Sequence, residues 1–571
     1  MRVRDRGMLG LLLMLAATAV AASPRYVESP PLATALGKVA VRDVAAGPTQ
    51  VPIITWGGDI ATVLANGNQT ATARGSIFAG KGLDLRLVRE DVFSKQLEAY
   101  LGGKSPYLRG TVGMLNLAAD ALARDPRTRP VVIYQLTWSA GGDALVVKPG
   151  IGGARDLKGK TIALQAYGPH VDYMTKILAD AGLQPRDVKI KWLPDLTGSD
   201  DTAMAALQAG DADAAFVITP DALVLTSGGS VGTGAEGSVR GARILLSTKT
   251  ANRIIADVYA VRADYFESNR KAVEDFVRGL MLGEEKLREL VRAKSARAGD
   301  YRSAMTAAAT ILLDSAQALS DAEGLFADAE FVGHAGNVQF FESANFPRRF
   351  SVIAQESAST FAALGLASGS AKASVAGWDF ASLRQGLTAA GPEAQRFDEG
   401  QVAAVVARRQ QQGTLDEGEI FSFEIFFEPN QNSFSADLYQ DAFSKVVDLA
   451  STYGGAVITV EGHSDPMAYL RDQKDGKPEV VLGRVKQSAK NLSLSRAVAV
   501  RDSIVGFAGR QGITLDDSQF AVVGHGIAQP RSGICGSDPC APKNEREWRS
   551  NMRVEFRILQ VEAESSVFKP L

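Results

Sequence analysis

Residues Asp156 to His170 read DLKGKTIALQAYGPH, and residues 205–220 read AALQAGDADAAFVITP. In the first stretch an apolar run at 161–164 leads into a polar loop, and 171–181 has the apolar spacing of a helix. In the second stretch a helical segment is followed by an apolar run at 214–218. Strand, loop and helix therefore alternate, which predicts an α/β fold with a parallel sheet.

The same alternation extends on both sides of these two stretches. Apolar runs predict further strands at 51–55, 84–88, 129–136, 144–147, 188–192 and 257–262, and helices at 59–65 and 203–209. Two longer stretches, 265–330 and 346–410, are mostly helical by apolar spacing. The polar segment 413–418 has no such pattern, so it predicts a linker.

Beyond this linker the pattern becomes that of a separate, smaller α+β module of ordinary domain size. Alternating or apolar runs predict strands at 420–427, 456–461, 519–523 and 553–561. Helical spacing predicts helices at 436–453 and 492–507. We therefore expect at least two folded units.

Length and composition agree with that expectation. The chain has 571 residues, more than one hydrophobic core usually organises. Its 46% hydrophobic and 22% charged residues are typical of soluble globular proteins. With 62 basic and 64 acidic residues the net charge is −2, which does not favour nucleic-acid binding. Two cysteines exclude a four-cysteine zinc site and a cysteine-held iron–sulfur cluster, and we expect no metal and no cofactor.

The first 22 residues have the three parts of a secretory signal peptide. A basic stretch at 2–6 precedes an apolar run at 8–20, and small residues follow at Ala21 and Ala22. The alternative is a transmembrane anchor, but the apolar run is too short to span a bilayer. No cysteine ends the run, which argues against a lipoprotein. We expect cleavage after Ala22 and an exported protein.

Three features of the first unit occur in a fixed order: LKGKTIAL at 157–164, LQAGDADAAFVITP at 207–220 and the strand at 257–262. In this order they resemble the type II periplasmic substrate-binding proteins of ABC importers, with the nitrate, sulfonate, taurine and thiamine-precursor binders as the nearest group. The resemblance covers about residues 50–385. It implies two lobes that close on a small polar or anionic solute, with a possible ABC permease as partner.

Three loops follow predicted strands, where free backbone N–H groups and helix N-termini favour polar or anionic ligands. The loop at 56–58 combines an indole with two glycines that permit close approach. The other two loops lie at 165–170 and 219–221, and 257–262 returns between the lobes. The predicted solute-binding residues are Trp56, Gly57, Gly58, Gln165, Tyr167, Gly168, Thr219 and Asp257.

Structural roles compete with solute binding at several positions. Trp56 is also consistent with a core tryptophan, and Asp59 with a helix N-cap. His170 is predicted to be a solvated residue at a helix N-terminus rather than a ligand. Asp143 and Asp257 are expected to hydrogen-bond backbone groups of the hinge. The prediction of a solute-binding site therefore rests more on the three loops than on any single side chain.

Four motifs occur in order in the second unit. They are VEGHSD at 460–465, LSLSRAVAV at 492–500, VVGHG at 522–526 and NMRVEF at 551–556. The set resembles the OmpA-like domain, which is also found in the peptidoglycan-associated lipoprotein and in flagellar stator proteins. The resemblance covers about residues 418–562 and implies non-covalent binding of peptidoglycan through the diaminopimelate of its stem peptide.

By motif, Asp465 corresponds to the residue that holds the ammonium group of diaminopimelate, and Arg496 to the one that holds its carboxylate. Such a zwitterionic end needs one anion and one bidentate cation at a fixed separation. Ser464 stands beside Asp465, while Asn551 and Arg553 match the family's last motif, with methionine in place of its middle arginine. A surface ion pair is the alternative role for Asp465 and Arg496.

Two further features of the second unit concern its loops. The segment between the Asp465 and Arg496 motifs is longer than is usual in the family, and 469–490 is expected to be a surface insertion. Cys535 and Cys540 precede the last strand. In an exported protein they are expected to form a disulfide, whose short ring contributes about 2 kcal/mol.

These patterns divide the chain into a signal peptide at 1–22, a leader at 23–50, a two-lobed substrate-binding domain at 51–390, a helical connector at 391–417, an OmpA-like domain at 418–562 and a tail at 563–571. Together the two resemblances imply a non-enzymatic solute-binding protein in the periplasm of a Gram-negative-type envelope, fixed to the cell wall. The alternative is a wall-bound sensory or scaffold protein with the same fold, which a collapsed cleft would favour. The sequence has no Ser/His/Asp arrangement, H-E-x-x-H motif or P-loop.

Overall fold

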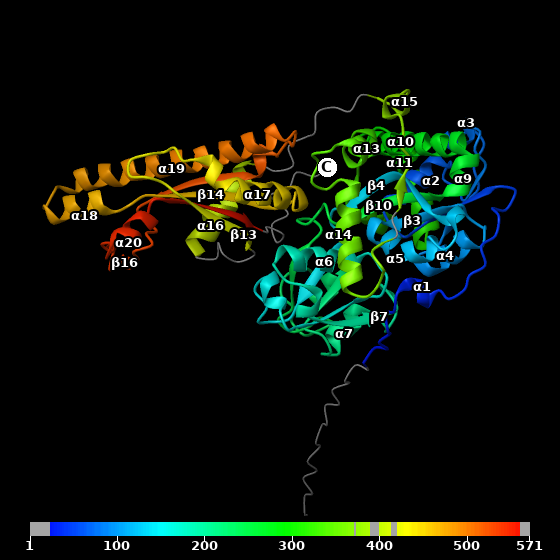
Figure 1. The fold of residues 1–571 in the computed structure, drawn as a ribbon, viewed down its shortest axis with the longest axis horizontal. Coiled ribbons are helices and arrows are strands. Elements are labelled where there is room, and N and C mark those ends of the chain that lie inside the picture. The colour runs from blue at the N-terminus through cyan, green and yellow to red at the C-terminus, as the bar shows by residue number, and fades with distance from the viewer. Residues whose placement is uncertain (1–22, 371–372, 389–398, 413–418, 560–571) are drawn as a thin grey trace, which may run out of the picture.

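The computed structural model describes residues 23–370, 373–388, 399–412 and 419–559, which form two modules (Figure 1). The larger, N-terminal module contains two five-stranded sheets and a separate strand pair. The C-terminal module is elongated and ends in a helical hairpin at the far end of the molecule. The expected signal peptide, the linker at 413–418 and the tail at 563–571 lie outside the described residues.

The first lobe is built on a sheet with the order β11-β4-β10-β3, and a short strand also pairs with β4. The strands of this sheet are β3 (Tyr107–Thr111), β4 (Pro130–Ser139), β10 (Ala256–Arg262), β11 (Ala329–Phe331) and β12 (Ser374–Val375). The parallel pair of β1 (Thr49–Ile53) and β2 (Leu85–Arg89) packs near β3. Because β10 is antiparallel to both β3 and β4, this sheet is not the parallel sheet that we predicted.

The second lobe has the strand order β7-β6-β8-β5-β9. Its strands are β5 (Asp143–Val147), β6 (Thr161–Gln165), β7 (Lys189–Leu193), β8 (Ala214–Ile218) and β9 (Arg243–Ser247). β7, β6 and β8 are parallel as predicted, whereas β5 is antiparallel to both neighbours. The chain passes from the first lobe to the second after β4 and returns through β10. Each sheet therefore contains strands that run in opposite directions.

Helices cover both sheets, and the α/β prediction for this module is confirmed. The main helices are α2 (Asp59–Ala65), α4 (Phe93–Leu101), α5 (Val112–Leu122), α6 (His170–Asp180), α7 (Ala203–Gln208), α8 (Thr219–Leu225), α10 (Arg270–Arg292), α11 (Ala298–Leu313), α12 (Leu319–Ala327), α13 (Gly333–Glu342) and α14 (Phe350–Ala363). α16 (Glu399–Gln412) packs on the C-terminal module instead. α14 packs on α5 of the first lobe and on α6 of the second. One apolar cluster continues from α5 into β5 and α6, so the two lobes share a core.

The segment 23–48, which is most of the expected leader at 23–50, contacts both lobes. Tyr26 donates a hydrogen bond from its hydroxyl to Asp211 Oδ2 at 2.6 Å in the second lobe. Further along, the short helix α1 (Leu32–Ala35) packs on α5, and Arg124 donates to the Ala33 carbonyl at 2.7 Å. This segment therefore bridges the two lobes.

The C-terminal module has a four-stranded sheet with the order β13-β18-β14-β15. Its strands are β13 (Glu419–Phe426), β14 (Val457–His463), β15 (Phe520–Gly526) and β18 (Arg553–Leu559). Apolar side chains on one face, Ile458 and Val460, share a core with Val500 and Ile504 of α19 (Glu479–Arg510) and with α17 (Gln440–Thr452). β14 and β15 are parallel, and β18 is antiparallel to β13 and β14.

α19 begins 13 residues before the helix predicted at 492–507. Its first turns and α18 (Met467–Lys474) form the helical hairpin at the end of the molecule (Figure 1). This hairpin comprises most of the segment 469–490 that we expected to be a surface insertion. Tyr469, Leu482 and Ile527 form a small apolar cluster beneath it, which explains why the added residues are helical rather than irregular.

The two modules are in contact near the point where the chain returns to the first lobe. The buried Tyr453 donates from its hydroxyl to Asp180 Oδ2 on α6 at 3.0 Å. The amide of Arg253 donates to the Thr452 carbonyl at 3.2 Å. An added Cβ at Gly455 would lie 1.8 Å from the Lys249 carbonyl oxygen, so only glycine permits this approach.

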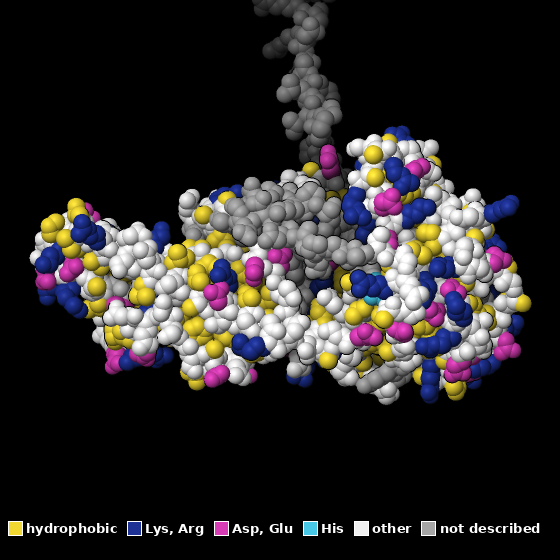
Figure 2. Space-filling model, turned by 90° about the horizontal axis from the view of Figure 1, so that it is seen from above, with side chains coloured by type: hydrophobic (Ala, Val, Ile, Leu, Met, Phe, Trp, Pro, Cys, Tyr) yellow, Lys and Arg dark blue, Asp and Glu magenta, His cyan; other side chains and the backbone are white. Residues whose placement is uncertain are grey.

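The surface in Figure 2 has basic and acidic side chains interspersed, without one large patch of either sign. This distribution agrees with the near-neutral net charge of −2. Over the described ranges, no helix has both the length and the apolar composition that a bilayer span requires.

Candidate functional sites

The loop Trp56-Gly57-Gly58 is held against the crossing between the lobes. The Trp56 indole donates a hydrogen bond to Thr137 Oγ1 at 2.9 Å. Its ring lies so close to Gly142 that an added Cβ there would be 2.5 Å from a ring carbon. At Gly57 an added Cβ would lie 1.9 Å from the carbonyl oxygen of Leu325 in α12. The glycines at both positions are therefore required by close packing within the protein.

A buried ion cluster, which the sequence analysis missed, lies beside this loop. Arg109 on β3 is fully buried, with Nη1 2.9 Å from Asp257 Oδ1 and Nε 3.2 Å from Asp59 Oδ2. Thr137 Oγ1 donates to Asp257 Oδ2 at 2.9 Å, and Tyr259 donates to Asp59 Oδ1 at 3.2 Å. Burial favours the neutral guanidine, but the Asp257 and Asp59 carboxylates outweigh it and raise the pKa of Arg109.

This cluster corrects two expectations. Asp59 is the first residue of α2, whose N-cap is Gly58, and its carboxylate pairs with Arg109 rather than capping the helix. Asp257 contacts the side chains of Arg109 and Thr137, where we expected hinge backbone groups. The one signal in the sequence is an arginine inside the short run Tyr107–Thr111, which also explains why β3 was not predicted.

The N-terminus of α5 is occupied by a carboxylate from the other lobe. Asp172 on α6 accepts hydrogen bonds at Oδ2 from Thr111 Oγ1 at 3.1 Å and from the Gly113 amide at 3.2 Å. Its Oδ1 is buried and has no hydrogen-bond partner among the described residues. Burial raises the pKa of Asp172 to about 7, although these two hydrogen bonds oppose the shift. Here the protein's own carboxylate stands where a helix N-terminus favours an anion.

We expect Asp172→Asn to be more stable than the wild type at pH 8, by about 1–3 kcal/mol, and to differ little at pH 5. The folded protein binds the Asp172 proton more tightly than the unfolded chain does, because the folded pKa is the higher one. The favourable contribution is therefore present at low pH and is lost as the pH rises through about 7. Urea unfolding at both pH values measures this, with exposed Asp200→Asn as control. Equal pH dependence of wild type and variant would contradict the expectation.

His170 and Asp143 meet at the crossing between the lobes. His170 is fully buried, and its Nε2 lies 2.8 Å from Asp143 Oδ1. Ser139 Oγ donates to Asp143 Oδ2 at 2.6 Å, and Thr248 accepts from the Asp143 amide at 3.1 Å. The prediction of a solvated His170 is wrong, because the first turn of α6 points into the contact between the lobes.

The remaining predicted solute residues fall into two groups. Thr219 donates from its hydroxyl to the Gly141 carbonyl, so it joins Trp56, Gly58 and Asp257 around the crossing. Tyr167 instead donates to the Pro30 carbonyl at 2.6 Å, with a positive φ of 60°. Gln165 donates to the Pro194 carbonyl at 3.3 Å, and its amide packs against Gly168. The structure brings together the first group, whereas Tyr167 of the second group contacts the segment 23–48.

In the C-terminal module, Arg496 is buried in α19 beneath the end of β14. Its guanidinium donates to the carbonyls of Gln431, Glu428 and His463 at 2.7, 3.1 and 3.3 Å. Burial lowers the pKa of Arg496 to about 10, against the effect of the Asp465 carboxylate. The guanidinium therefore remains charged at neutral pH and is fixed in position.

Asp465 lies at the same end of the sheet and is half-buried. Its Oδ1 accepts a hydrogen bond from the Met467 amide at 2.7 Å, at the start of α18. The end of the adjacent strand β15 holds the backbone beside Asp465, since the Ser464 amide donates to the Gly526 carbonyl at 2.8 Å. A fixed cation and a more accessible anion are thus placed near each other, as a zwitterionic ligand requires.

The other predicted wall-binding residues contact the protein itself. Ser464 Oγ donates to the Ala489 carbonyl at 3.0 Å. Asn551 is fully buried and accepts at Oδ1 from the Arg531 amide at 2.6 Å. Arg553 lies 2.6 Å from Glu555 in an ion pair. These contacts hold the strand ends and the loop before β18 in place around Asp465 and Arg496.

Cys535 and Cys540 form a disulfide, as expected. It closes a small hairpin in which Asp538 accepts hydrogen bonds from the Tyr469 hydroxyl at 2.5 Å and from Gln473 Nε2 at 2.9 Å. The disulfide loop is therefore attached to α18 of the helical hairpin.

Replacing both cysteines with serine is expected to lower the free energy of unfolding of the C-terminal module by about 2 kcal/mol. Without the disulfide this short loop is no longer closed, so the unfolded chain gains conformational entropy. Chemical unfolding followed by circular dichroism measures this. Reduced wild-type protein should show the same loss. An unchanged unfolding midpoint in both samples would contradict the expectation.

Two sheets joined by two crossing strands, with polar loops gathered at the crossing, make the N-terminal module a two-lobed α/β unit. Residues 71–289 match the family model described as NMT1/THI5 like, and this match includes parts of both lobes. No curated protein matches the sequence.

Several solved structures are similar to this chain. The periplasmic aliphatic sulphonate binding protein SsuA from Escherichia coli is 17% identical, with a TM-score of 0.41, over 62% of this chain and 97% of that chain. The alkanesulfonate-binding protein SsuA from Xanthomonas axonopodis pv. citri, bound to MOPS, is 19% identical, with a TM-score of 0.38, over 56% and 95%. The peptidoglycan-associated lipoprotein from Burkholderia pseudomallei is 18% identical, with a TM-score of 0.17, over 24% and 87%.

Proposed function

We propose that this protein is a non-enzymatic periplasmic solute-binding protein, of the kind that delivers solutes to an ABC importer, held on peptidoglycan by an OmpA-like C-terminal module. The observation that carries the proposal is the convergence of loops from both lobes at the crossing. Trp56 and Asp257 come from the first lobe and Thr219 from the second. A solute bound there would contact both lobes and so favour their closure.

The anion-binding point of the proposed site is the N-terminus of α5. The Gly113 amide and the Thr111 hydroxyl at this helix end bind Asp172, so an anionic solute must displace that carboxylate. When the lobes separate, Asp172 regains water and the helix end becomes available. This supports a small anion, such as a sulfonate or carboxylate, as the solute class.

A thermal-shift screen of residues 23–571 against nitrate, sulfonates, short carboxylates and pyrimidines tests the proposal. We expect one class to raise the melting temperature of the wild type, and we expect Asp172→Ala to bind that anion more tightly because its competitor is gone. Asp200→Ala, at an exposed aspartate in the second lobe, is the matched control. A flat response from both wild type and Asp172→Ala would overturn solute binding at this point.

That flat response would favour the second candidate, a wall-bound sensory or scaffold protein without transport. Two observations support it: the lobes share one apolar core, and the segment 23–48 bridges them. Both features oppose the opening that a transport cycle needs.

The wall-binding half of the proposal rests on Asp465 and Arg496. Their charges are opposite, and Arg496 is fixed by three carbonyls. Because the surface has no large patch of one sign in Figure 2, specific contact with a zwitterion is a better account of wall attachment than bulk electrostatics.

A further inference from the structure

A second polar cluster lies on the face of the C-terminal sheet opposite α17 and α19. Glu461 and His463 are two residues apart on β14, so their side chains point to the same face. The adjacent parallel strand β15 has an irregularity here, since Gly462 pairs with Gly524 but His463 pairs with Gly526. His525 is the extra residue of this bulge, which presents its imidazole beside the other two side chains.

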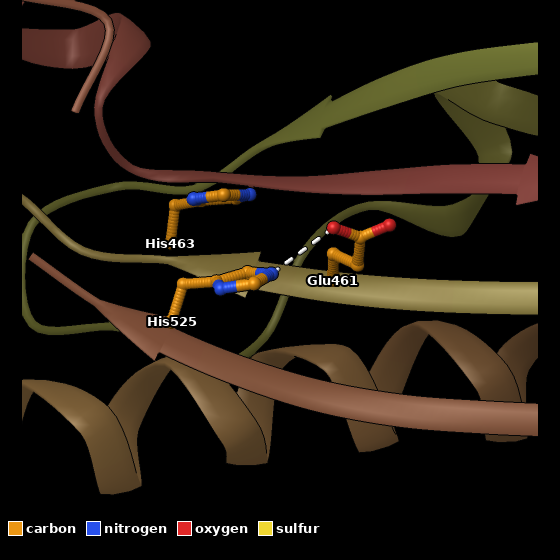
Figure 3. A group of neighbouring side chains, drawn as sticks. All are labelled: Glu461, His463 and His525. Carbon is orange, nitrogen blue, oxygen red and sulfur yellow. Dashed lines mark hydrogen bonds and ion pairs between the residues drawn. The ribbon is translucent and has the colours of Figure 1, made fainter. Parts of the chain in front are cut away.

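The three side chains point to a common space in Figure 3. His525 Nε2 lies 3.0 Å from Glu461 Oε2, and the His463 and His525 rings are stacked with their centroids 4.8 Å apart. One ligand atom from each residue lies within 4.8 Å of the other two. Glu461 and His463 are both only 1% exposed, so water has little access to either.

His463 is the member of this cluster that lacks a partner. Neither of its ring nitrogens makes a hydrogen bond within the described part of the chain. The Glu555 Oε1 atom is 3.9 Å from Nε2, too far for a hydrogen bond. The other three of the chain's four histidines do have partners: Asp143 for His170, the Phe380 carbonyl for His334 and Glu461 for His525. A buried imidazole without a partner is costly, which points to a missing ligand.

We propose that Glu461, His463 and His525 bind a divalent transition-metal ion, with Zn²⁺ as the best-suited probe. Two imidazole nitrogens and one carboxylate oxygen are an established zinc donor set, and the fourth position would go to water or to Glu555. Zinc bonds of about 2.0–2.1 Å place tetrahedral ligands roughly 3.3 Å apart. The described atoms lie within 4.8 Å of one another, so a small side-chain adjustment would form the site.

Charged side chains of both signs surround the cluster. The ion pairs described around the cluster involve four carboxylates and three guanidiniums: Glu419, Glu424, Glu461, Glu555, Arg531, Arg553 and Arg557. This network has one more carboxylate than guanidinium. Arg557 Nε lies 3.5 Å from Glu461 Oε1, so it can orient the ligating carboxylate from outside the site.

The test is Zn²⁺ binding by residues 23–571, measured by equilibrium dialysis and by the visible absorption of the Co²⁺-substituted protein. We expect one tightly held ion per chain, a tetrahedral Co²⁺ spectrum and a raised melting temperature. Glu461→Gln and His525→Gln should weaken Zn²⁺ binding at least tenfold. His334→Gln, at a histidine of the other module, is the matched control and should bind Zn²⁺ as the wild type does.

Glu461→Gln keeps the shape of the side chain and a polar contact with His525, so it separates loss of the metal from loss of the fold. Circular dichroism of the metal-free variants checks this. Wild-type protein that retains no Zn²⁺, or variants that bind it as tightly as the wild type, would overturn the site. Neither outcome depends on wall attachment, because sedimentation with peptidoglycan is a separate measurement.

Discussion

Asp465→Ala is expected to abolish sedimentation of this protein with purified peptidoglycan while leaving its melting temperature unchanged. The carboxylate is half-buried and makes one described hydrogen bond, to the Met467 amide, so its removal costs the fold little. In the complex, the diaminopimelate ammonium would lose its charged partner. Such truncations cost about 2 kcal/mol or more, which is roughly thirtyfold in Kd. The measurement is the pelleted fraction across a range of peptidoglycan concentrations.

Arg496 needs a more careful substitution because it also supports the fold. Its three carbonyl contacts would be lost in Arg496→Ala, which is therefore expected to lose both stability and binding. Arg496→Lys keeps the charge but not the bidentate fork, so it should weaken binding with a smaller loss of stability. Arg501→Ala, on the same helix and paired with Asp502, is the control. Pelleting of Asp465→Ala and Arg496→Lys at the wild-type level would overturn wall binding by this module.

The largest loss of stability is expected from Arg109→Met in the N-terminal module. This change leaves the Asp59 and Asp257 carboxylates buried without their cation, at a cost of about 3–5 kcal/mol. Burial already raises the pKa of Asp59 to about 6 in the presence of Arg109. Without Arg109 the Asp59 carboxylate should take up a proton more readily, so the loss is expected to be smaller at pH 5 than at pH 8.

Urea unfolding at the two pH values measures this effect. Arg89→Met is the matched control, since Arg89 pairs with Asp314 in a partly exposed position and should lose less than about 1 kcal/mol. If Arg109→Met lowered the free energy of unfolding no more than Arg89→Met does, the buried cluster would not stabilise the first lobe.

Sequence patterns predicted the elements well wherever apolar spacing was regular. α2 and β8 have the predicted bounds, and α6 begins one residue earlier than predicted. β3 was missed because Arg109 interrupts a short strand, and the burial of that arginine depends on carboxylates 50 and 148 residues away in the chain. The predicted parallel sheets were wrong in part because strand direction depends on how the chain crosses between the lobes.

The same division between local patterns and contacts of distant segments applies to the candidate sites. Trp56, Thr219 and Asp257 were predicted as solute-binding residues from the order of strands and loops, and only the structure showed that they meet at the crossing. Nothing local in the sequence indicated that Asp172 would reach the N-terminus of α5, because the contact joins two lobes. The bulge that brings His525 beside His463 is likewise a property of strand pairing, so spacing in the sequence gave no sign of the Glu461, His463 and His525 cluster.

By itself, the sequence determined two modules, the α/β character of the first, the disulfide pair and the residues at the ends of β1 and β8. These follow from local periodicity and from the positions of glycine, proline and cysteine, which act over a few residues. Only the tertiary structure decided which charges are buried together, which carboxylate fills the helix N-terminus and which histidine is left without a partner. Those outcomes depend on contacts between distant segments, where burial decides the energetic cost of each polar group.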